Sequence, residues 1–391
     1  MRFGLSLPPQ IRVYGAFFLY SFTLGAFFPR IADIQDSMAV EEGALGFALI
    51  GSAVGTLVSL TFATPIIEKV GYRKALLALI PLLGLLYAIA TFALTPVALF
   101  LLLLPAGLAI GSIEIIINIE ADRVEHQIGR RMMNRAHAFW SFGFFAAGIV
   151  GGAMAQSGIS PQAHLLFMVP VSVLGTVLLL GQFEPAPHRA TSSREPAPLF
   201  ARPTGAIMVL VLVTMAAMVL EGGGIDWSAI YMRDTLGAAP FIMSLAVAIG
   251  PLTQGVVRFF ADGFVERYSP TVVARVLLGV LGVGTLIVFF AQTAVVALAG
   301  FAVMGIGTSA LFPLAISAAA QRTDRSAVIN VAALAQTSFV AFLLGPPLLG
   351  VVAEHFGVRW SFGIGIPLVV MSFLLAGALG NKPQPHAVDD D

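Results

Sequence analysis

The feature that most constrains this chain is a succession of twelve apolar stretches, each long enough to cross a membrane as a helix. A helix that crosses the ~30 Å hydrocarbon core of a bilayer needs about 20 residues. The stretches are continuously apolar and do not alternate with polar residues, which excludes a membrane β-barrel. We therefore predict an all-α membrane protein whose transmembrane helices lie at residues 12–30, 43–67, 75–94, 97–119, 136–156, 163–182, 205–229, 241–261, 272–292, 294–318, 327–352 and 361–380.

Composition leads to the same class of protein. Of the 391 residues, 58% are hydrophobic and only 11% are charged, whereas about 25% of residues are charged in a typical soluble domain. A soluble chain this apolar cannot cover its surface with polar groups. The formal net charge is zero and no long basic run is present, so we expect the lipid bilayer as a partner and no nucleic acid.

The sequence offers little chemistry for catalysis or metal binding. It has no Cys, and its six His residues show no HxxxH or HExxH spacing, which leaves neither thiolate ligands nor a helical zinc motif. No nucleophile–base arrangement is recognisable. We therefore expect no metal, no cofactor, no catalytic residues and no enzymatic activity.

The distribution of basic residues predicts the orientation of the chain. If the N-terminus is cytoplasmic, 18 of the 21 Lys and Arg residues fall on the cytoplasmic side, and only Arg30, Arg233 and Arg359 fall outside. Loops rich in Lys and Arg stay on the cytoplasmic side of a membrane. We therefore expect a monomeric, multi-pass protein of the cell inner (plasma) membrane with both termini in the cytoplasm.

A polar segment divides the chain into two halves of six helices. Residues 184–204 are rich in Pro and Ser, which is typical of a linker. We expect helical bundles at residues 1–183 and 205–381, a cytoplasmic linker between them, and a disordered tail at residues 382–391.

The two halves also show traces of a repeat. An offset of 198 residues relates several similar positions, and a shared offset indicates duplicated, pseudo-symmetric bundles. This is the pattern of a secondary transporter whose site lies between its halves. The related positions are Gly107 and Gly305, Gly152 and Gly350, Asp36 and Asp234, and the pairs Glu68-Lys69 and Glu266-Arg267.

Three carboxylates, Glu114, Glu221 and Asp226, lie inside the predicted helices. Ionisable groups within a membrane are costly and therefore indicate function. Glu114 shares a helical stripe with Gly107, Gly111 and Asn118, because these positions are three or four residues apart. Glu114 and Asn118 are predicted to supply hydrogen bonds to a substrate, and a tight helix contact around a protonated Glu114 is the alternative.

Glu221 precedes three consecutive glycines, Gly222 to Gly224. Each Gly weakens a helix interior by about 1 kcal/mol relative to Ala. We expect the helix to break here, because freed carbonyls beside a carboxylate are a common way to build a site in mid-membrane. A hinge without ligand contact is the alternative. The repeat pairs Glu221 with Thr23, which would place these two residues on facing walls.

Asp226 and Trp227 lie near the outer end of the seventh stretch. They are predicted to form an outer gate with Arg30, which ends the first stretch. The alternative for Trp227 is an anchor at the membrane interface.

His137 lies at the start of the fifth stretch. Because histidine ordinarily titrates near neutral pH, His137 is predicted either to relay protons or to form a hydrogen bond to Glu120 or Glu125. Three neutral residues are candidates either for substrate binding or for helix–helix hydrogen bonds, namely Tyr20, Gln254 and Gln336.

The loop after the second stretch resembles a known signature. TPIIEKVGYRK (residues 64–74) is similar to the GxxxDRxGRR motif of the major facilitator superfamily, and DGFVERYS (residues 262–269) resembles a second copy. The resemblance implies a central cavity lined by helices 1, 4, 7 and 10, into which the Glu114 stripe would face. It also implies a switch in which loop acids pair across the halves when the inner side closes, formed here by Glu68, Arg73, Glu266 and Arg267.

A narrower resemblance is to a bacterial branch that contains rhizopine-transporter-like proteins. Two departures from proton-driven exporters weigh against drug export. Residues 101–111 contain no Arg, and the fifth stretch contains no Gly-Pro pair. The residues that carry the branch resemblance are Asn118, Glu125, His137, Ser141, Gly143, Asp226-Trp227-Ser228 and Arg233-Asp234.

These observations predict a secondary active transporter that moves a small neutral polar or cationic organic solute by alternating access. Glu114 and Glu221 would couple the movement to protons, because a carboxyl group in a low dielectric can change its protonation state near neutral pH. A cavity with acids and no bases repels anions. Two alternatives stay open: a proton-driven exporter of amphipathic compounds, and a membrane sensor that binds a ligand without transporting it.

Overall fold

The structure is a computed structural model that describes residues 4–130, 132–187 and 201–380, without the side chains of residues 261–266 and 341. Most of the expected linker and the expected tail lie outside the described residues. Within the described part, twelve helices are long and apolar enough to cross a membrane, and no strand occurs. The prediction of an all-α membrane protein is therefore confirmed.

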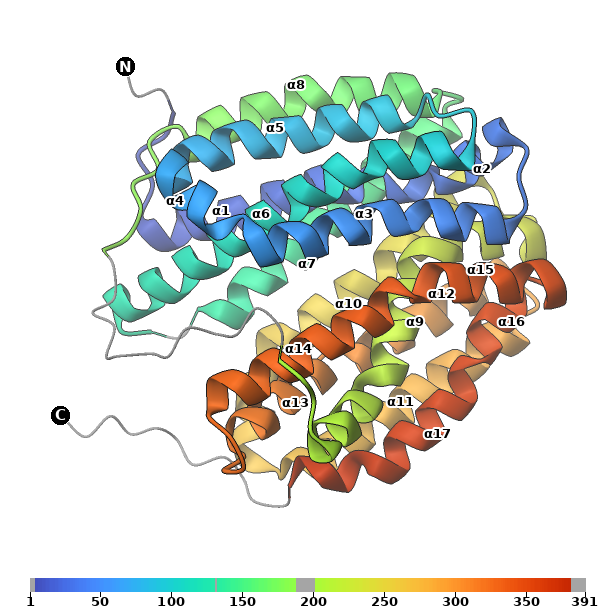
Figure 1. The fold of residues 1–391 in the computed structure, drawn as a ribbon. Helices are drawn as coiled ribbons and strands as arrows, with labels where there is room; N and C mark the ends of the chain where they lie inside the picture. Colours follow the sequence, from blue (N-terminus) through green and yellow to red (C-terminus); the bar gives the residue numbers. More distant parts are fainter. Residues whose placement is uncertain (1–3, 131, 188–200, 381–391) are drawn as a thin grey trace.

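Helices fill both halves of the chain (Figure 1). The first half contains α1 (Pro9–Gly25), η1 (Phe28–Arg30), α2 (Ile31–Met38), α3 (Glu42–Phe62), α4 (Thr64–Val70), α5 (Tyr72–Ala90), α6 (Pro96–Ile128), α7 (Met133–Gln156) and α8 (Pro161–Leu180). The second half contains α9 (Gly205–Leu236), α10 (Pro240–Arg267), α11 (Pro270–Phe290), α12 (Ala294–Thr308), α13 (Leu311–Ala320), α14 (Ala327–Leu343), α15 (Gly345–Phe356), α16 (Val358–Gly363), α17 (Gly365–Leu375) and η2 (Ala376–Leu379).

Side-chain caps begin equivalent helices in the two halves. Thr95 Oγ1 accepts a hydrogen bond from the Ala98 N–H at the start of α6 (3.2 Å), and Thr293 Oγ1 accepts one from the Val296 N–H at the start of α12 (3.4 Å). These bonds satisfy N–H groups that a helix leaves unpaired at its first turn. Thr95 and Thr293 are 198 residues apart, so the repeat extends to helix capping.

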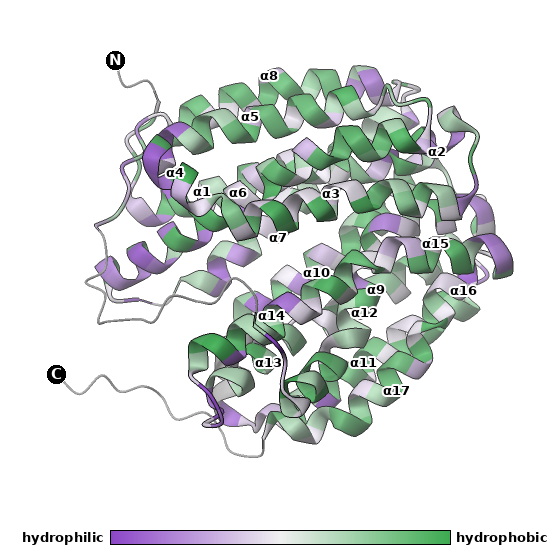
Figure 2. Cartoon of the chain, in the orientation of Figure 1, coloured by the Kyte–Doolittle hydropathy of each residue, from purple (hydrophilic) through white to green (hydrophobic). Residues whose placement is uncertain are grey.

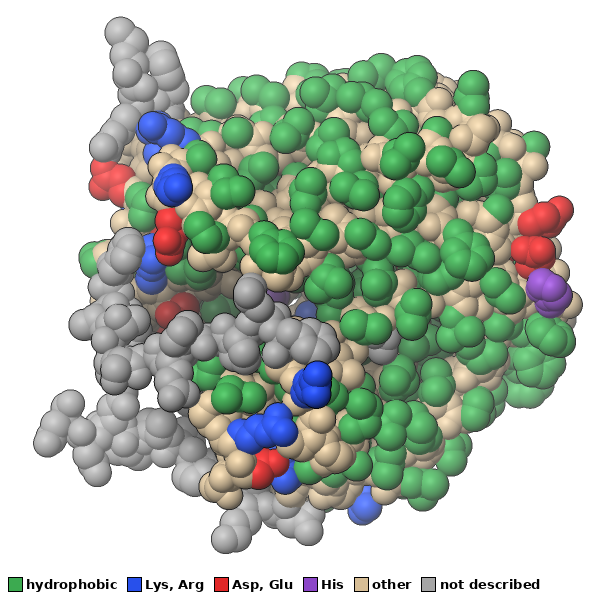
Figure 3. All heavy atoms as spheres, in the orientation of Figure 1, with side chains coloured by type: hydrophobic (Ala, Val, Ile, Leu, Met, Phe, Trp, Pro, Cys, Tyr) green, Lys and Arg blue, Asp and Glu red, His purple; other side chains and the backbone are tan. Residues whose placement is uncertain are grey.

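The two bundles lie side by side and diverge toward one end (Figure 1). We call the end at which α1 begins and η2 ends the open side, and the end at which α2 lies the closed side. Hydrophilic residues gather toward both ends, with hydrophobic residues between them (Figure 2). The face in Figure 3 shows a broad hydrophobic belt, charged side chains at its two ends, and a hollow between the halves on the open side. This distribution suits a protein surrounded by lipid.

The halves meet through two related pairs of helices. Gly152 of α7 packs against Phe241 of α10, and Gly350 of α15 packs against the Glu42 carbonyl of α3. Gly152 and Gly350 are the pair that the repeat predicts. A hydrogen bond from the Gly43 N–H to Glu354 Oε2 (3.1 Å) adds to the second contact.

The helix break expected after Glu221 is wrong, because α9 continues through Gly222 to Gly224. Gly222 packs against Phe342 and Gly223 against Leu349, so these glycines allow close helix contact. A break does occur in the tenth membrane span, between the end of α12 and the start of α13.

Candidate functional site

A cavity of about 260 Å³, here called the central cavity, lies between the two halves. Its walls come from α1, η1, α3, α5, α6 and α7 of the first half and from α9, α14 and α15 of the second. Glu114, Glu221 and Asp226 all line it, and its described lining residues include no Lys or Arg. A cavity that receives groups from both halves is the geometry expected of a transporter site.

Glu114 is held by two hydrogen-bonding groups. Asn118 Nδ2, one turn further along α6, donates to Glu114 Oε2 (3.0 Å) and to its backbone carbonyl (2.9 Å). The Tyr20 hydroxyl of α1 also bonds to this carboxyl group. The structure thus brings Tyr20, which was predicted separately, to the predicted pair Glu114 and Asn118. The small residues of the stripe, Gly107 and Gly111, pack against α3 instead of facing the cavity.

Asp226 faces the central cavity from α9. It interacts electrostatically with Tyr87 of α5, whose hydroxyl is hydrogen-bonded to Ser52 of α3. Tyr87 and Tyr20 also interact electrostatically, so two phenols connect Asp226 of the second half with Glu114 of the first. Sequence reasoning missed Tyr87 and Ser52, because a single Tyr or Ser in an apolar helix gives no sign of which way it faces.

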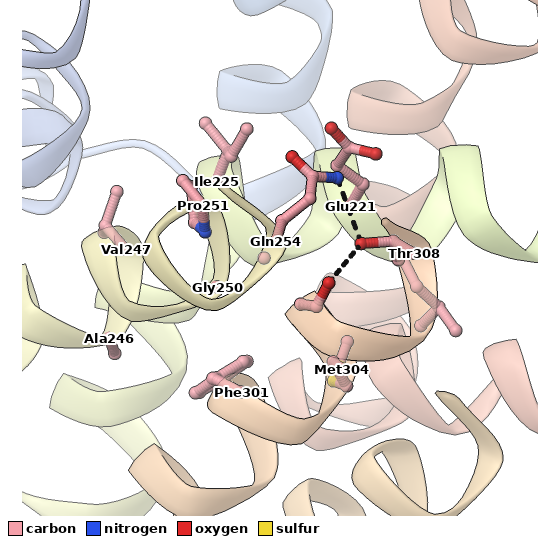
Figure 4. A pocket seen from close by; sticks show the side chains of 13 residues that line it. Glu221, Ile225, Ala246, Val247, Gly250, Pro251, Gln254, Phe301, Met304 and Thr308 are labelled. Carbon is pink, nitrogen blue, oxygen red and sulfur yellow. Dashed lines mark hydrogen bonds between the residues drawn. The ribbon is translucent and has the colours of Figure 1, made fainter. Parts of the chain in front are cut away.

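Glu221 lines the central cavity and also a pocket of about 30 Å³ inside the second half, which we call the side pocket. Figure 4 shows Gln254 and Thr308 beside Glu221. Gln254 Nε2 donates to Thr308 Oγ1 (3.1 Å), which donates to the Gly305 carbonyl (3.2 Å). The pocket has room for one or two water molecules. Gln254, predicted as a substrate ligand, lines this pocket and not the central cavity.

A basic residue, Arg258, lies near Glu221, although the sequence predicts a site with acids and no bases. Arg258 of α10 interacts electrostatically with Glu221 and with His137 of α7. Its Nε donates to the Ser309 carbonyl (2.8 Å), at the break between α12 and α13. The sequence placed Arg258 near a helix end, but α10 continues to Arg267. Arg258 lies near the end of the candidate membrane span, Pro240–Phe260, as the sequence predicts.

Glu120 and Glu125, the predicted hydrogen-bond partners of His137, bond to other groups. Glu125 Oε2 accepts hydrogen bonds from two backbone N–H groups at the start of α7 (2.6 and 3.0 Å). Glu120 pairs with Arg123 (3.3 Å) and accepts a bond from the Ala186 N–H (3.0 Å). His137 instead faces Arg258 across the two halves.

Aromatic side chains form a continuous strip on the first-half wall of the central cavity. Phe27 stacks on Tyr87 with ring centroids 4.5 Å apart and meets Phe28 edge-on at 6.0 Å. Phe28 lies 5.6 Å from Phe144, which stacks on Trp140 at 5.4 Å. We call these five residues the aromatic strip, and all of them line the cavity.

Four residues predicted to bind the substrate do not line the central cavity, namely Asn118 and Gln254, described above, and Thr23 and Gln336. Thr23 donates to a carbonyl of its own helix (2.9 Å) and lies against Gly84 of α5, so it does not face Glu221 from an opposite wall. Gln336 Oε1 accepts a hydrogen bond from the Ala201 N–H (2.9 Å), where the described chain leads into α9.

The structure does not bring the expected outer gate together. Arg30 pairs with Asp33 (2.7 Å) and donates to a backbone carbonyl before α8 (2.8 Å). Trp227 is fully buried and packs against Gly350 inside the second half, which also excludes it as an interface anchor. Of the three gate residues, only Asp226 lines the cavity.

Arg233 links the halves on the closed side in place of that gate. From the end of α9, its Nη1 donates to Asp36 Oδ1 (2.8 Å) and its Nη2 donates to Gln35 Oε1 (2.7 Å), both on α2. Asp234 holds the guanidinium from the other side (2.6 Å). The repeat had paired Asp36 with Asp234, but it gave no sign that both bind one Arg.

The residues assigned to the loop switch do not pair across the halves among the described side chains. Arg73 Nε donates to the Gly181 carbonyl at the end of α8 (3.0 Å), within its own half. Glu68 and Arg267 are exposed, and the side chain of Glu266 lies outside the described residues. This agrees with the separation of the halves on the open side.

Known proteins resemble the chain over nearly its whole length. A family model described as Major Facilitator Superfamily matches residues 13–225 and 211–390. An uncharacterized transporter of Sinorhizobium fredii is 29% identical over 364 residues, covering 92% of this chain and 94% of the relative. An uncharacterized MFS-type transporter of Yersinia pestis is 27% identical (91% and 92%), and the membrane protein MosC of Rhizobium meliloti is 22% identical (94% and 90%).

Solved structures give a likeness of fold. The nucleoside transporter NupG superposes with a TM-score of 0.65 at 14% identity, covering 95% of this chain and 98% of NupG. A mutant of NupG gives a TM-score of 0.73 at 12% identity, with 95% and 99% coverage.

Proposed function

Because the chain belongs to the major facilitator superfamily and is a transporter, we propose that it moves a small neutral polar or cationic organic solute by alternating access, coupled to protons. The observation that carries this proposal is the central cavity, which both halves enclose and three carboxylates line. Such a lining favours cations and neutral hydrogen-bonding solutes and repels anions.

Alternating access is supported by the contacts between the halves. Arg233 and the Gly43–Glu354 hydrogen bond join them on the closed side, while the bundles diverge on the open side (Figure 1). Glycine contacts of α7 with α10 and of α3 with α15 give surfaces on which two rigid bundles can rock. With the open side in the cytoplasm of the cell, this is an inward-facing state.

Glu114 and Glu221 are the proposed coupling residues. Glu114 meets solute in the central cavity, where Tyr20 and Asn118 orient it. Glu221 lies between that cavity and the side pocket, beside Arg258. A carboxyl group with an Arg partner can release a proton when the Arg approaches and bind one when it withdraws.

Uptake into proteoliposomes tests the proposal. The purified protein is reconstituted, and uptake of radiolabelled amines and polyols is measured with and without an imposed pH gradient. We expect gradient-dependent accumulation that Glu114→Gln and Glu221→Gln reduce to background. Glu41→Gln is the matched control, because Glu41 is exposed at the start of α3 and caps nothing with its side chain. Uptake that ignores the gradient and both cavity variants contradicts proton coupling.

A second candidate function is export of amphipathic compounds. The aromatic strip and the other apolar residues that line the cavity favour it. Overproduction in a drug-sensitive host would then raise resistance to several amphipathic compounds, whereas unchanged resistance would exclude this candidate.

A further inference from the structure

We infer that the solute is an organic cation whose ammonium group binds between the cavity acids and the aromatic strip. The inference rests on the proposed function and narrows its solute class. It uses three observations on the central cavity: the balance of charge, the aromatic wall and the connection between the two.

The balance of charge leaves two acids for a ligand. Of the three carboxylates, Glu221 has Arg258 as an electrostatic partner. Within the described part of the chain, Glu114 bonds to the neutral groups Tyr20 and Asn118. Because an amide N–H can only donate, the Glu114 Oε2 atom accepts from Asn118, and no basic side chain in this part of the chain pairs with it. Asp226 interacts with no basic side chain among the described residues.

The aromatic strip supplies the other part of a cation site, beside the acids. A ligand cation over the face of Trp, Tyr or Phe is attracted by the negative face of the ring, most strongly by Trp and most strongly where water is excluded. Five such rings touch one another along one wall, from Tyr87 to Trp140. A solute that needed only hydrogen bonds would gain little from this wall, whereas an alkylammonium group gains from both rings and acids.

Tyr87 joins the two features. It is the end of the aromatic strip and interacts electrostatically with Asp226. The Asp226 carboxyl group and the rings therefore border the same part of the cavity. The volume of about 260 Å³ restricts the solute to a small molecule, because pockets for drug-sized ligands span about 300–1,000 Å³.

Binding of a matched pair of probes tests the inference. Choline and its uncharged isostere 3,3-dimethylbutan-1-ol have nearly the same shape, so their difference reports the charge alone. Ethanolamine extends the test to a primary ammonium group. With purified protein in detergent, we expect choline or ethanolamine to bind at least about tenfold more tightly than the uncharged isostere. Equal affinity for charged and uncharged probes, or no binding of either cation, overturns the inference.

Single variants test the contribution of the acids and that of the rings to cation binding separately. We expect Asp226→Asn to remove most of the preference for the cation. We expect Trp140→Leu to weaken cation binding severalfold, and Trp140→Phe to restore part of it because a ring face returns. Trp360→Leu is the control, since Trp360 is 49% exposed and packs on Phe289 outside the cavity. Thermal unfolding of each variant without ligand shows whether it is folded. Weakening by Trp140→Phe as large as by Trp140→Leu contradicts the role of the ring.

Failure of the inference and failure of the proposed function give different results. Gradient-driven uptake of an uncharged polyol, without uptake of either cation, overturns the inference and leaves the proposed function intact. Preferential binding of a cation without any gradient-driven uptake overturns the proposed function and leaves the cation site intact.

Discussion

Gly107 of α6 packs against the Ser52 carbonyl of α3, and 198 residues later Gly305 of α12 packs against the Gly250 carbonyl of α10. The two halves therefore repeat this helix contact at equivalent positions. The polar residues around the contact do not repeat. Arg258 of the second half has Leu60 as its counterpart in the first.

The same asymmetry runs along the cavity walls. The repeat relates Asp226 to Phe28 of the aromatic strip, and Glu221 to Thr23. The helix packing is the same in both halves because each bundle must hold its own helices together. The polar residues of the site differ because the two halves share one site. We propose that Glu114 of the first half takes part in proton coupling through direct contact with the solute, and that Glu221 of the second half does so beside Arg258.

The largest expected effect separates the two acids. Glu221→Gln should abolish gradient-driven uptake but preserve exchange of solute across the membrane, because exchange needs no net proton movement. Glu114→Gln should weaken solute binding by about tenfold or more, since it removes a charged acceptor, and should reduce exchange as well. Counterflow assays with the two single variants make this comparison. Identical behaviour of both variants would show that the halves do not divide these tasks.

The next effect concerns the charge pair of the second half. Arg258→Leu removes the charge-assisted hydrogen bond to the Ser309 carbonyl and the electrostatic partner of Glu221, which should cost about 3 kcal/mol of stability. The double variant Arg258→Leu with Glu221→Gln should recover part of this loss, because the unpaired charge is gone. Unfolding in a denaturing detergent measures both. Additive losses in the double variant would mean that the two side chains do not interact.

A smaller effect tests the duplicated packing. Gly107→Val and Gly305→Val each place a side chain against a backbone carbonyl of the neighbouring helix, and should each cost about 2 kcal/mol. Gly279→Val is the control, because no atom lies within 4 Å of a Cβ added there. Thermal unfolding in detergent compares the three variants. A large loss in only one half would show that the contacts are not equivalent.

The smallest effect concerns the closed side. Arg233→Ala removes hydrogen bonds to Asp36 and Gln35, which should shift the conformational equilibrium toward the outward-facing state by about 1 kcal/mol, or about fivefold in population. The chain contains no Cys, so a single Leu49→Cys substitution reports access to the cavity by an impermeant thiol reagent applied outside the cell. Unchanged labelling would mean that Arg233 does not hold the closed side.

The membrane spans and their number were predictable, because hydropathy over about 20 residues is set by the thickness of the bilayer. The repeat was predictable from Gly107 and Gly305, whose packing demands a residue without a side chain. Glu114 and Asn118 do converge, because they lie one turn apart on α6, and Tyr20 of α1 meets Glu114 there.

Other parts of the site depend on contacts between distant segments. Thr23 lies three residues from Tyr20, yet it turns toward α5. Gln336 bonds to the chain before α9, which no local pattern indicates. Arg258 interacts with Glu221 and His137 of other helices, which no local pattern indicates. The glycines after Glu221 predict a break only when no neighbour packs on them, and here Phe342 and Leu349 do.

Proton movement caused by the solute tests the central claim most directly. Proteoliposomes that contain a trapped pH indicator are given solute with no initial gradient, and the internal pH is followed. We expect a solute-dependent pH change with the unaltered protein and none with Glu221→Gln. Solute entry without any pH change would contradict proton coupling, and an equal pH change with Glu221→Gln would contradict the role of Glu221 in it.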